Sequence, residues 1–171
     1  DGLNYRIRLT TDTWHDFYWR SVHPFMILLF KPPVDLIAFF LKGNKLWGAY
    51  VFVALGGAAC VYLAWIFIKS ATGNSVYASL IAAMLGLTTS HLIFGSLLES
   101  YIFLAASLLL FYVLLLKEKP LPPLIVASLM TIGITYTNFA QNVIALFAVR
   151  PNIKQMFRFV VSVLVFLVLL T

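Results

Sequence analysis

Carboxylates, histidines and an arginine gather near the start of the chain, where their chemistry fits acid–base catalysis and phosphate binding. Asp1, Asp12 and Asp16 supply the carboxylates, and Arg20 and His23 follow them. A carboxylate can accept a proton or bind a metal ion, and a cation can stabilise a developing anion. The alternative is a solvated loop, anchored at the membrane interface by its aromatic residues. No spacing in this segment is regular enough to name a particular metal.

A second candidate is Glu99, an acid at the edge of an apolar segment with His91 before it and Tyr101 after it. An acid in that position is costly unless it is solvated, paired or functional. Ser96 and Glu99 have the S-x-x-E spacing of a capping box, so Glu99 is predicted to be a helix cap, a functional acid or both. The sequence favours an interfacial polar role for His91 over a catalytic one.

A third polar group follows a predicted helix near residue 135. Thr131, Thr135, Asn138 and Asn142 are spaced by 4, 3 and 4 residues, which places them on one helix face. Their hydroxyls and amides are expected to hold neighbouring helices together. The alternative is that they line a polar cavity on the same side as Glu99.

The composition indicates that the helices carrying these candidate residues lie in a membrane. Of the 171 residues, 62% are hydrophobic and 11% are charged, whereas soluble chains are about 45–50% apolar and about 25% charged. The net charge is +6, but the basic residues stand in ones and twos beside apolar runs. That distribution is typical of membrane flanks and excludes a surface that tracks nucleic-acid phosphates. The lone Cys60 excludes an intrachain disulfide.

The predicted fold is therefore an all-α, polytopic transmembrane helix bundle. Residues 1–45 form an outer loop, in which 1–22 lack helical periodicity, and Pro32 and Pro33 separate two short interfacial or re-entrant helices at 23–30 and 34–41. Residues 143–149 are expected to return as a half-helix, and the bundle is expected to belong to a longer chain. Small residues at 54–59 allow close helix approach. Membrane spans are predicted at about 46–68, 76–94, 98–116, 124–142 and 156–171.

Alternation of these spans predicts which residues share a membrane face. Lys69, the loop at Lys117 and Lys119, and the basic residues at 150–158 fall on one face, which is the better cytoplasmic candidate because its short loops are basic. The outer loop, Glu99 and the Asn138 region fall on the opposite face. Five of the six acids then meet on the outer side.

Three stretches resemble segments of a known family of membrane enzymes. An acid at the start of an outer segment, a second acid some ten residues later, and the run Tyr18-Trp-Arg-Ser-Val-His-Pro-Phe25 resemble the first outer loop of GT-C-type glycosyltransferases. The glycosyltransferase family 39-like bacterial membrane proteins are the most similar group. The stretches Leu92–Tyr101 and Gly133–Asn138 resemble the later helix start and polar break of such proteins.

The resemblance implies transfer of a sugar from a polyprenyl-phosphate donor at the outer face of a bacterial inner membrane. Asp1 is then the first candidate for the catalytic base or for a ligand of a divalent cation, and Asp12 the second. Arg20 and His23 would bind phosphate or order the loop, and Glu99 would complete the pocket. Asp16, His91, Tyr101 and Asn138 are the further candidate substrate-binding residues.

Two other classes of function remain open from the residues themselves. A transporter or channel subunit would carry ionisable or helix-breaking residues near mid-membrane in more than one span. A noncatalytic membrane scaffold would use the small residues at 54–59 only for helix contact.

Overall fold

The structure is a computed structural model that describes residues 2–11 and 26–170, and in these ranges every regular element is helical. This confirms the predicted all-α class. The helices, in chain order, are α1 Gly2–Thr10, α2 Met26–Phe40, α3 Lys45–Thr72, α4 Ser75–Leu87, α5 Thr89–Phe94, α6 Tyr101–Leu116, α7 Leu121–Ile134, the short 3-10 helix η1 Tyr136–Asn138, α8 Phe139–Val149 and α9 Ile153–Leu170.

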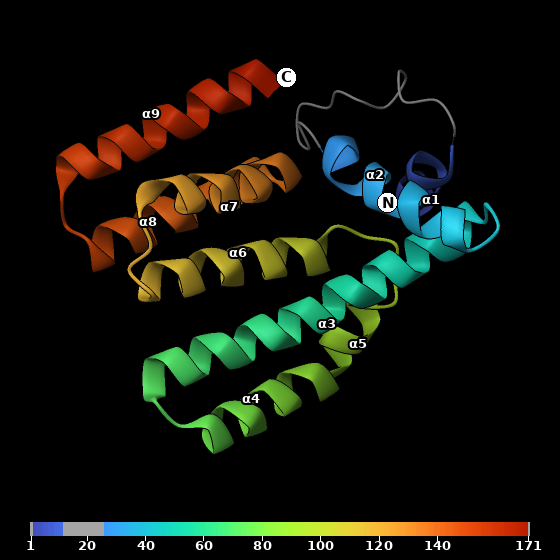
Figure 1. The fold of residues 1–171 in the computed structure, drawn as a ribbon, viewed down its shortest axis with the longest axis horizontal. Coiled ribbons are helices and arrows are strands. Elements are labelled where there is room, and N and C mark those ends of the chain that lie inside the picture. Colours follow the sequence, from blue (N-terminus) through green and yellow to red (C-terminus); the bar gives the residue numbers. More distant parts are fainter. Residues whose placement is uncertain (1, 12–25, 171) are drawn as a thin grey trace.

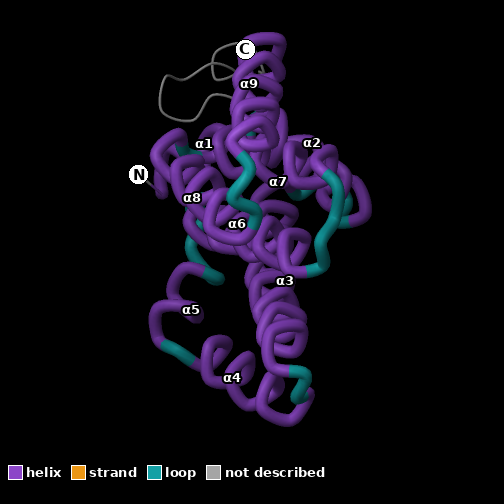
Figure 2. Tube along the Cα trace, turned by 90° about the vertical axis from the view of Figure 1, so that its left-hand side faces the viewer, coloured by secondary structure: helices purple, strands orange, loops and turns teal. Residues whose placement is uncertain are grey.

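The long helices stack in a row that starts at α4 and passes through α3, α6 and α7 to α9, with each helix in contact with the next. Figure 2 shows the same order from the side, with α9 and α4 at opposite extremes. The helices α1 and α2 pack against one end of α3. The α3–α4 turn and the α6–α7 loop lie at one end of these helices, and the connection from α4 through α5 to α6 lies at the other.

The α3 helix contacts α1, α2, α4, α5 and α6, and its ends have clear local causes. The Asn44 side chain accepts a hydrogen bond from the Trp47 backbone N–H at 3.1 Å, which satisfies one free donor of the first turn. At the other end Gly73 adopts φ +71°, and its N–H bonds to the Lys69 carbonyl. A left-handed glycine in this position stops a helix.

Close approach along α3 depends on glycine, as the small residues at 54–59 predicted. A Cβ built on Gly56 would lie 2.6 Å from the Phe103 ring of α6, and one built on Gly48 would lie 2.8 Å from the Val34 carbonyl oxygen of α2. Glycine therefore sets the distance between α3 and each of these helices.

Two apolar cores stabilise the row. The first contains Tyr5, Phe30, Val53 and Ile102 and joins α1, α2, α3 and α6. The second is centred on Phe111, Leu124, Leu146 and Phe159 and joins α6 to α7, α8 and α9. The α4 helix buries only Ala78 and Ala82, so it contributes little to either core.

Two expectations for the first 41 residues are wrong. Residues 2–10 form a helix, because Tyr5 and Leu9 bury one face against neighbouring helices. The predicted break at Pro32 and Pro33 is also absent, and one helix runs from Met26 to Phe40. Proline in a helix interior costs about 3 kcal/mol, and burial of Phe30, Val34 and Ala38 offsets that cost here.

Two predicted spans are each divided in the structure. The 76–94 span is split at Thr88, whose φ of −65° and ψ of 142° separate α4 from α5. The 124–142 span ends at Ile134, because Thr135 is extended with φ −156° and ψ 124°. The return segment is longer than the predicted 143–149, since α8 begins at Phe139. The helix predicted over 98–116 starts at Tyr101 instead.

Two described helices, α3 and α9, are long and apolar enough to cross a membrane. The helices α4, α6 and α7 are apolar but shorter, with 13, 16 and 14 residues. At 1.5 Å per residue they span about 20 to 24 Å.

Candidate functional site

The first part of the candidate site lies where α1 meets the start of α6. The Tyr5 hydroxyl donates a hydrogen bond of 3.0 Å to the Ser100 Oγ atom, and both side chains are buried. Glu99 directly precedes Ser100 and is half-buried. This contact brings the N-terminal helix beside Glu99, although the two are distant in sequence.

The charges at this junction act on Tyr5. Burial raises the pKa of the Tyr5 phenol above its ordinary value, because the phenolate would lose its hydration. The Ser100 hydrogen bond opposes this shift, the negative charge of Glu99 adds to it, and the positive charge of Arg8 opposes it. Tyr5 is therefore a neutral hydrogen-bond donor at physiological pH, held between an acid and a cation.

A buried lysine joins α1 to α2 at the same end of the molecule. Lys31 is only 1% exposed, and its Nζ atom donates to the Thr11 carbonyl at 2.7 Å and to Asp35 Oδ1 at 3.3 Å. A buried cation is stable only when it is paired and hydrogen-bonded. Lys31 and Asp35 therefore position the end of α1 against α2.

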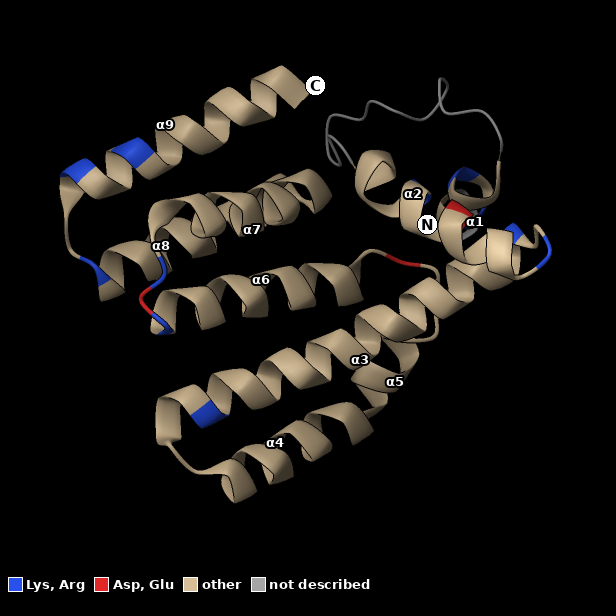
Figure 3. Ribbon diagram, in the orientation of Figure 1, with Lys and Arg blue, Asp and Glu red and all other residues tan. Residues whose placement is uncertain are grey.

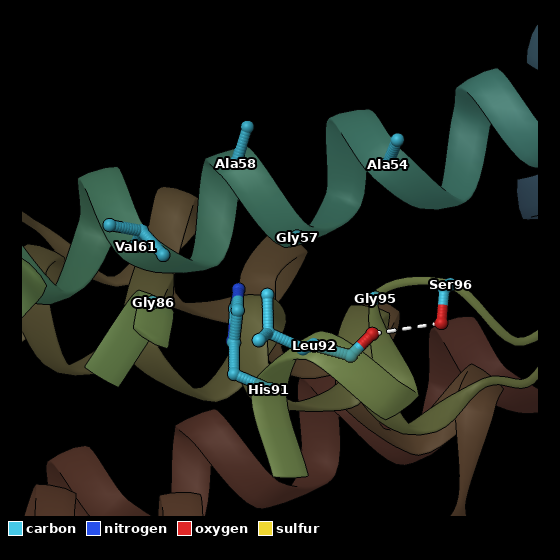
Figure 4. Close-up of a pocket in the computed structure, with 9 residues that line it drawn as sticks. All are labelled: Ala54, Gly57, Ala58, Val61, Gly86, His91, Leu92, Gly95 and Ser96. Carbon is cyan, nitrogen blue, oxygen red and sulfur yellow. Dashed lines mark hydrogen bonds between the residues drawn. The ribbon is translucent and has the colours of Figure 1, made fainter. Parts of the chain in front are cut away.

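The second part of the site is a cleft of about 350 Å³ between α3 and the α4–α5 segment. Small residues open it, with Ala54, Gly57 and Ala58 on one wall and Gly86 and Gly95 on the other. In Figure 4 the His91 ring points from α5 toward Gly57. A Cβ built on Gly57 would lie 3.6 Å from His91 Nε2.

The predicted capping box is not formed. The Ser96 hydroxyl donates instead to the backbone carbonyls of Leu92 at 2.8 Å and Ile93 at 3.0 Å, and Figure 4 shows the bond to Leu92. The α6 helix begins at Tyr101, too late for Ser96 to cap it. Glu99 therefore does not cap a helix together with Ser96, although the spacing of the two residues predicted that it would.

A smaller cavity of about 170 Å³ brings His91 and Tyr101 together. It lies between α3, α4, α5 and α6, and Thr88, Ser90 and Cys60 also line it. The Phe94 and Tyr101 rings pack 5.1 Å apart beside it. His91 and Tyr101 thus share this cavity, whereas Glu99 lines neither cavity and is linked to them only through the chain segment that leads into α6.

The other predicted site residues fall into two groups. Asn138 lies in η1, between α7 and α8, where its Oδ1 atom accepts a hydrogen bond from Gln141 Nε2 at 2.9 Å. It lines neither cavity. The remaining predicted residues lie outside the described part of the chain, namely Asp1, Asp12, Asp16, Arg20 and His23.

The polar stripe near residue 135 does not lie on one helix face, because the chain leaves the helix at Thr135. Its expected role in helix association is nevertheless confirmed for two members. The Thr131 hydroxyl donates to Ser107 Oγ of α6 at 3.2 Å, and Asn142 Nδ2 donates to Ser128 Oγ at 3.0 Å. These buried bonds connect α6 to α7 and α7 to α8.

Sequence reasoning missed Tyr5, Arg8, Lys31 and Asp35 as site-forming residues. The four-residue spacing of Lys31 and Asp35 is a signal of an ion pair on a helix, but the prolines between them concealed that helix. Tyr5 has no comparable local signal, because its partner is Ser100.

Within the described ranges, no three His, Cys, Asp or Glu side chains are grouped so that they could hold a metal ion. Among the described residues at this end, Asp35 is paired with Lys31, which leaves Glu99 as the described acid without an ion pair. The described residues therefore do not fit a divalent-cation site. The chain matches no known protein family, no curated protein and no solved structure.

Proposed function

We propose that this chain is an integral membrane protein that transfers a sugar from a polyprenyl-phosphate donor, with its site at the end of the bundle that carries α1 and Glu99. The membrane placement is supported by α3 and α9, whose most apolar 18-residue windows are only 28% and 11% buried within the protein. A core helix of a soluble protein would be mostly buried. These helices expose large apolar side chains that a bilayer would cover.

The distribution of charge supports the same placement. Figure 3 shows basic positions on α9, at the end of α8, in the α6–α7 loop and near the end of α3, all at one end of the bundle. The acids of α2 and of the α5–α6 connection lie at the other end, together with the basic turn between α2 and α3. The helices between the two ends are almost without charge, as expected for a hydrocarbon environment.

The observation that carries the functional proposal is the position of Glu99 beside α1. The proposed reaction needs Glu99 to lie on the same side of the membrane as the N-terminal outer segment that carries Asp1 and Asp12. The Tyr5–Ser100 hydrogen bond, which joins α1 to the residue after Glu99, supports the proposal for the helix that follows Asp1. Had Glu99 lain at the end that carries Glu118, the proposed site would have been excluded.

In the proposed reaction the hydroxyl oxygen of an acceptor attacks the anomeric carbon of the donor sugar. The new carbon–oxygen bond forms as the bond from the anomeric carbon to the phosphate oxygen breaks, and polyprenyl phosphate leaves with that electron pair. A carboxylate takes the proton of the acceptor hydroxyl. Asp1 and Asp12 are the proposed bases, and Glu99 is the proposed partner that orients the acceptor.

The cleft between α3 and the α4–α5 segment offers a place for the lipid part of the donor. Its walls are mainly alanine, glycine, valine and leucine, and it reaches Gly95 and Ser96 next to the polar junction. An apolar chain in this cleft would leave its phosphate near residues 95–101. His91 would then contact the chain or its phosphate.

The test is sugar transfer by the full chain from a labelled polyprenyl-phosphate sugar in membranes. Asp1→Asn, Asp12→Asn and Glu99→Gln each remove one carboxylate with little change in volume, and loss of the base should lower turnover roughly 100-fold or more. Glu118→Gln is the matched control, since this acid lies at the opposite end of the bundle. Unchanged turnover in all three site variants would contradict the proposed acids.

Transport is a second candidate function, and the two divided helices favour it. Breaks at Thr88 and Thr135 interrupt helices in two separate parts of the row, and discontinuous helices are typical of transporter binding sites. Flux of a solute into proteoliposomes that contain the chain but no lipid-linked sugar would support transport. Absence of such flux, together with active transfer, would support the transferase.

A further inference from the structure

We propose that the basic end of the bundle binds an anionic phospholipid, whose phosphate lies between Lys154 and Arg158 on α9. This inference rests on the membrane placement in the proposed function but not on sugar transfer. It concerns the end of the molecule opposite to Glu99 (Figure 3).

The charge at this end is not balanced by the protein. Among the described residues, Glu118 is the one acid at this end, beside six basic residues, Lys69, Lys117, Lys119, Arg150, Lys154 and Arg158. The described ranges contain one ion pair, Lys31–Asp35, and it belongs to the other end. Five net positive charges are thus available to anions from the surroundings.

Two of the cations at this end contact neutral groups of the protein, which do not neutralise their positive charge. Lys69 lies over the Trp65 ring, with Nζ 4.6 Å from the ring centroid. Arg150 donates to the Lys119 carbonyl at 2.9 Å, which holds the end of α8 against the α6–α7 loop. Both contacts use neutral partners, so the charge itself remains.

Lys154 and Arg158 are the two cations of this end that line a common surface hollow. They are exposed and lie four residues apart on α9, which places their Cβ atoms about 6 Å apart. Like charges at this spacing destabilise a helix slightly, and an anion bound between them would relieve that repulsion. They line a surface hollow of about 460 Å³ with Ile153 and Phe157.

The two apolar residues of this hollow indicate a lipid rather than a soluble anion. Ile153 is 67% exposed and Phe157 is 68% exposed, and each directly precedes one of the cations. An acyl chain would cover them and continue along the exposed apolar face of α9, whereas a free phosphate would leave them in water. The combination of two cations and an adjacent apolar strip fits a phospholipid with a negative headgroup.

The test measures lipid binding to the full chain, purified in neutral detergent, by native mass spectrometry. Phosphatidylglycerol is titrated against phosphatidylcholine with the same acyl chains, and inorganic phosphate is the soluble comparison. We expect preferential binding of phosphatidylglycerol, weakened about fivefold by Lys154→Gln and about fivefold by Arg158→Gln. Lys42→Gln, which removes an exposed lysine at the opposite end, should leave this affinity unchanged.

Three results would overturn the proposal. They are equal binding of the two phospholipids, unchanged phosphatidylglycerol affinity in both α9 variants, or displacement of the lipid by inorganic phosphate at constant ionic strength. Because all substituted side chains are exposed, the variants should keep the wild-type melting temperature. This experiment does not measure sugar transfer. Failure of the lipid-binding proposal can therefore be distinguished from failure of the transferase proposal, which the Glu99→Gln assay tests.

Discussion

Tyr5 shows how a single side chain can join the N-terminal helix to the remainder of the bundle. Its phenol combines apolar burial with one hydrogen bond to Ser100, and Ser100 is itself buried. A buried hydroxyl that loses its partner is destabilising, so this pair should matter more than an exposed one.

Tyr5→Phe is expected to lower the free energy of unfolding by about 1 kcal/mol, because Ser100 then loses its donor. The measurement is denaturant unfolding of the full chain in detergent. Ser100→Ala should have a similar effect, and the double variant should cost less than the sum of the two. Tyr62→Phe, which removes the hydroxyl of an exposed tyrosine, should be neutral. Additive losses in the double variant would show that the bond does not couple these residues.

The raised pKa of Tyr5 also predicts a dependence on alkaline pH. The folded protein holds the phenolic proton more tightly than the unfolded chain, whose tyrosine pKa is about 10. The resulting stability is complete below pH 10 and falls as the pH rises toward the folded pKa. Tyr5→Phe should therefore lose less stability than the wild type between pH 9 and about 11. Parallel stability curves for both proteins would contradict this assignment.

At the scale of helices, the contact between α3 and α6 depends on a glycine and a cluster of aromatic rings. The Phe103 ring stacks on Phe52 with centroids 4.5 Å apart, and it also contacts Phe30 at 4.5 Å. These contacts hold the ring against Gly56. The ring therefore has little room to move if a side chain is added to that glycine.

Gly56→Ala is expected to destabilise the bundle by about 1–3 kcal/mol, the usual cost of overpacking. Its Cβ would lie 2.6 Å from Phe103, so the aromatic cluster must shift. Gly57→Ala is the matched control, because its Cβ would meet its nearest neighbour, His91 Nε2, at 3.6 Å. Gly57→Ala should be neutral or stabilising, since alanine is the better helix former. Equal melting temperatures for the two variants would refute close packing at Gly56.

At the scale of the whole molecule, the two charged ends predict a definite membrane orientation. The turn between α2 and α3 lies at one end, and the α3–α4 turn and the α6–α7 loop lie together at the other. If the row spans the bilayer, these two ends face opposite compartments.

Cysteine labelling tests that orientation, and the chain suits it because Cys60 is its single cysteine. In a Cys60→Ser background, Ala71→Cys and Lys119→Cys should react with an impermeant maleimide from one side of sealed vesicles. Leu41→Cys should react only from the opposite side, and all three should react after permeabilisation. Labelling of all three from the same side would refute the spanning arrangement.

The sequence by itself determined the all-α class, the positions of the long apolar helices α3 and α9, and the alternation of charged loops. Hydrophobicity and charge are properties of short stretches, so they can be read without knowledge of partners. The α3 helix is an element that such local properties define, with a cap at Asn44 and an end at Gly73.

Only the tertiary structure decided which polar residues meet. Tyr5 and Ser100 are 95 positions apart, and no local pattern links them. The continuous α2 helix and the helical α1 likewise depend on burial against other helices, which outweighs the local effects of proline and of a weak apolar periodicity. The break at Thr88 has in addition a local cause, since the Thr88 hydroxyl accepts a hydrogen bond from the His91 backbone N–H and so caps the start of α5.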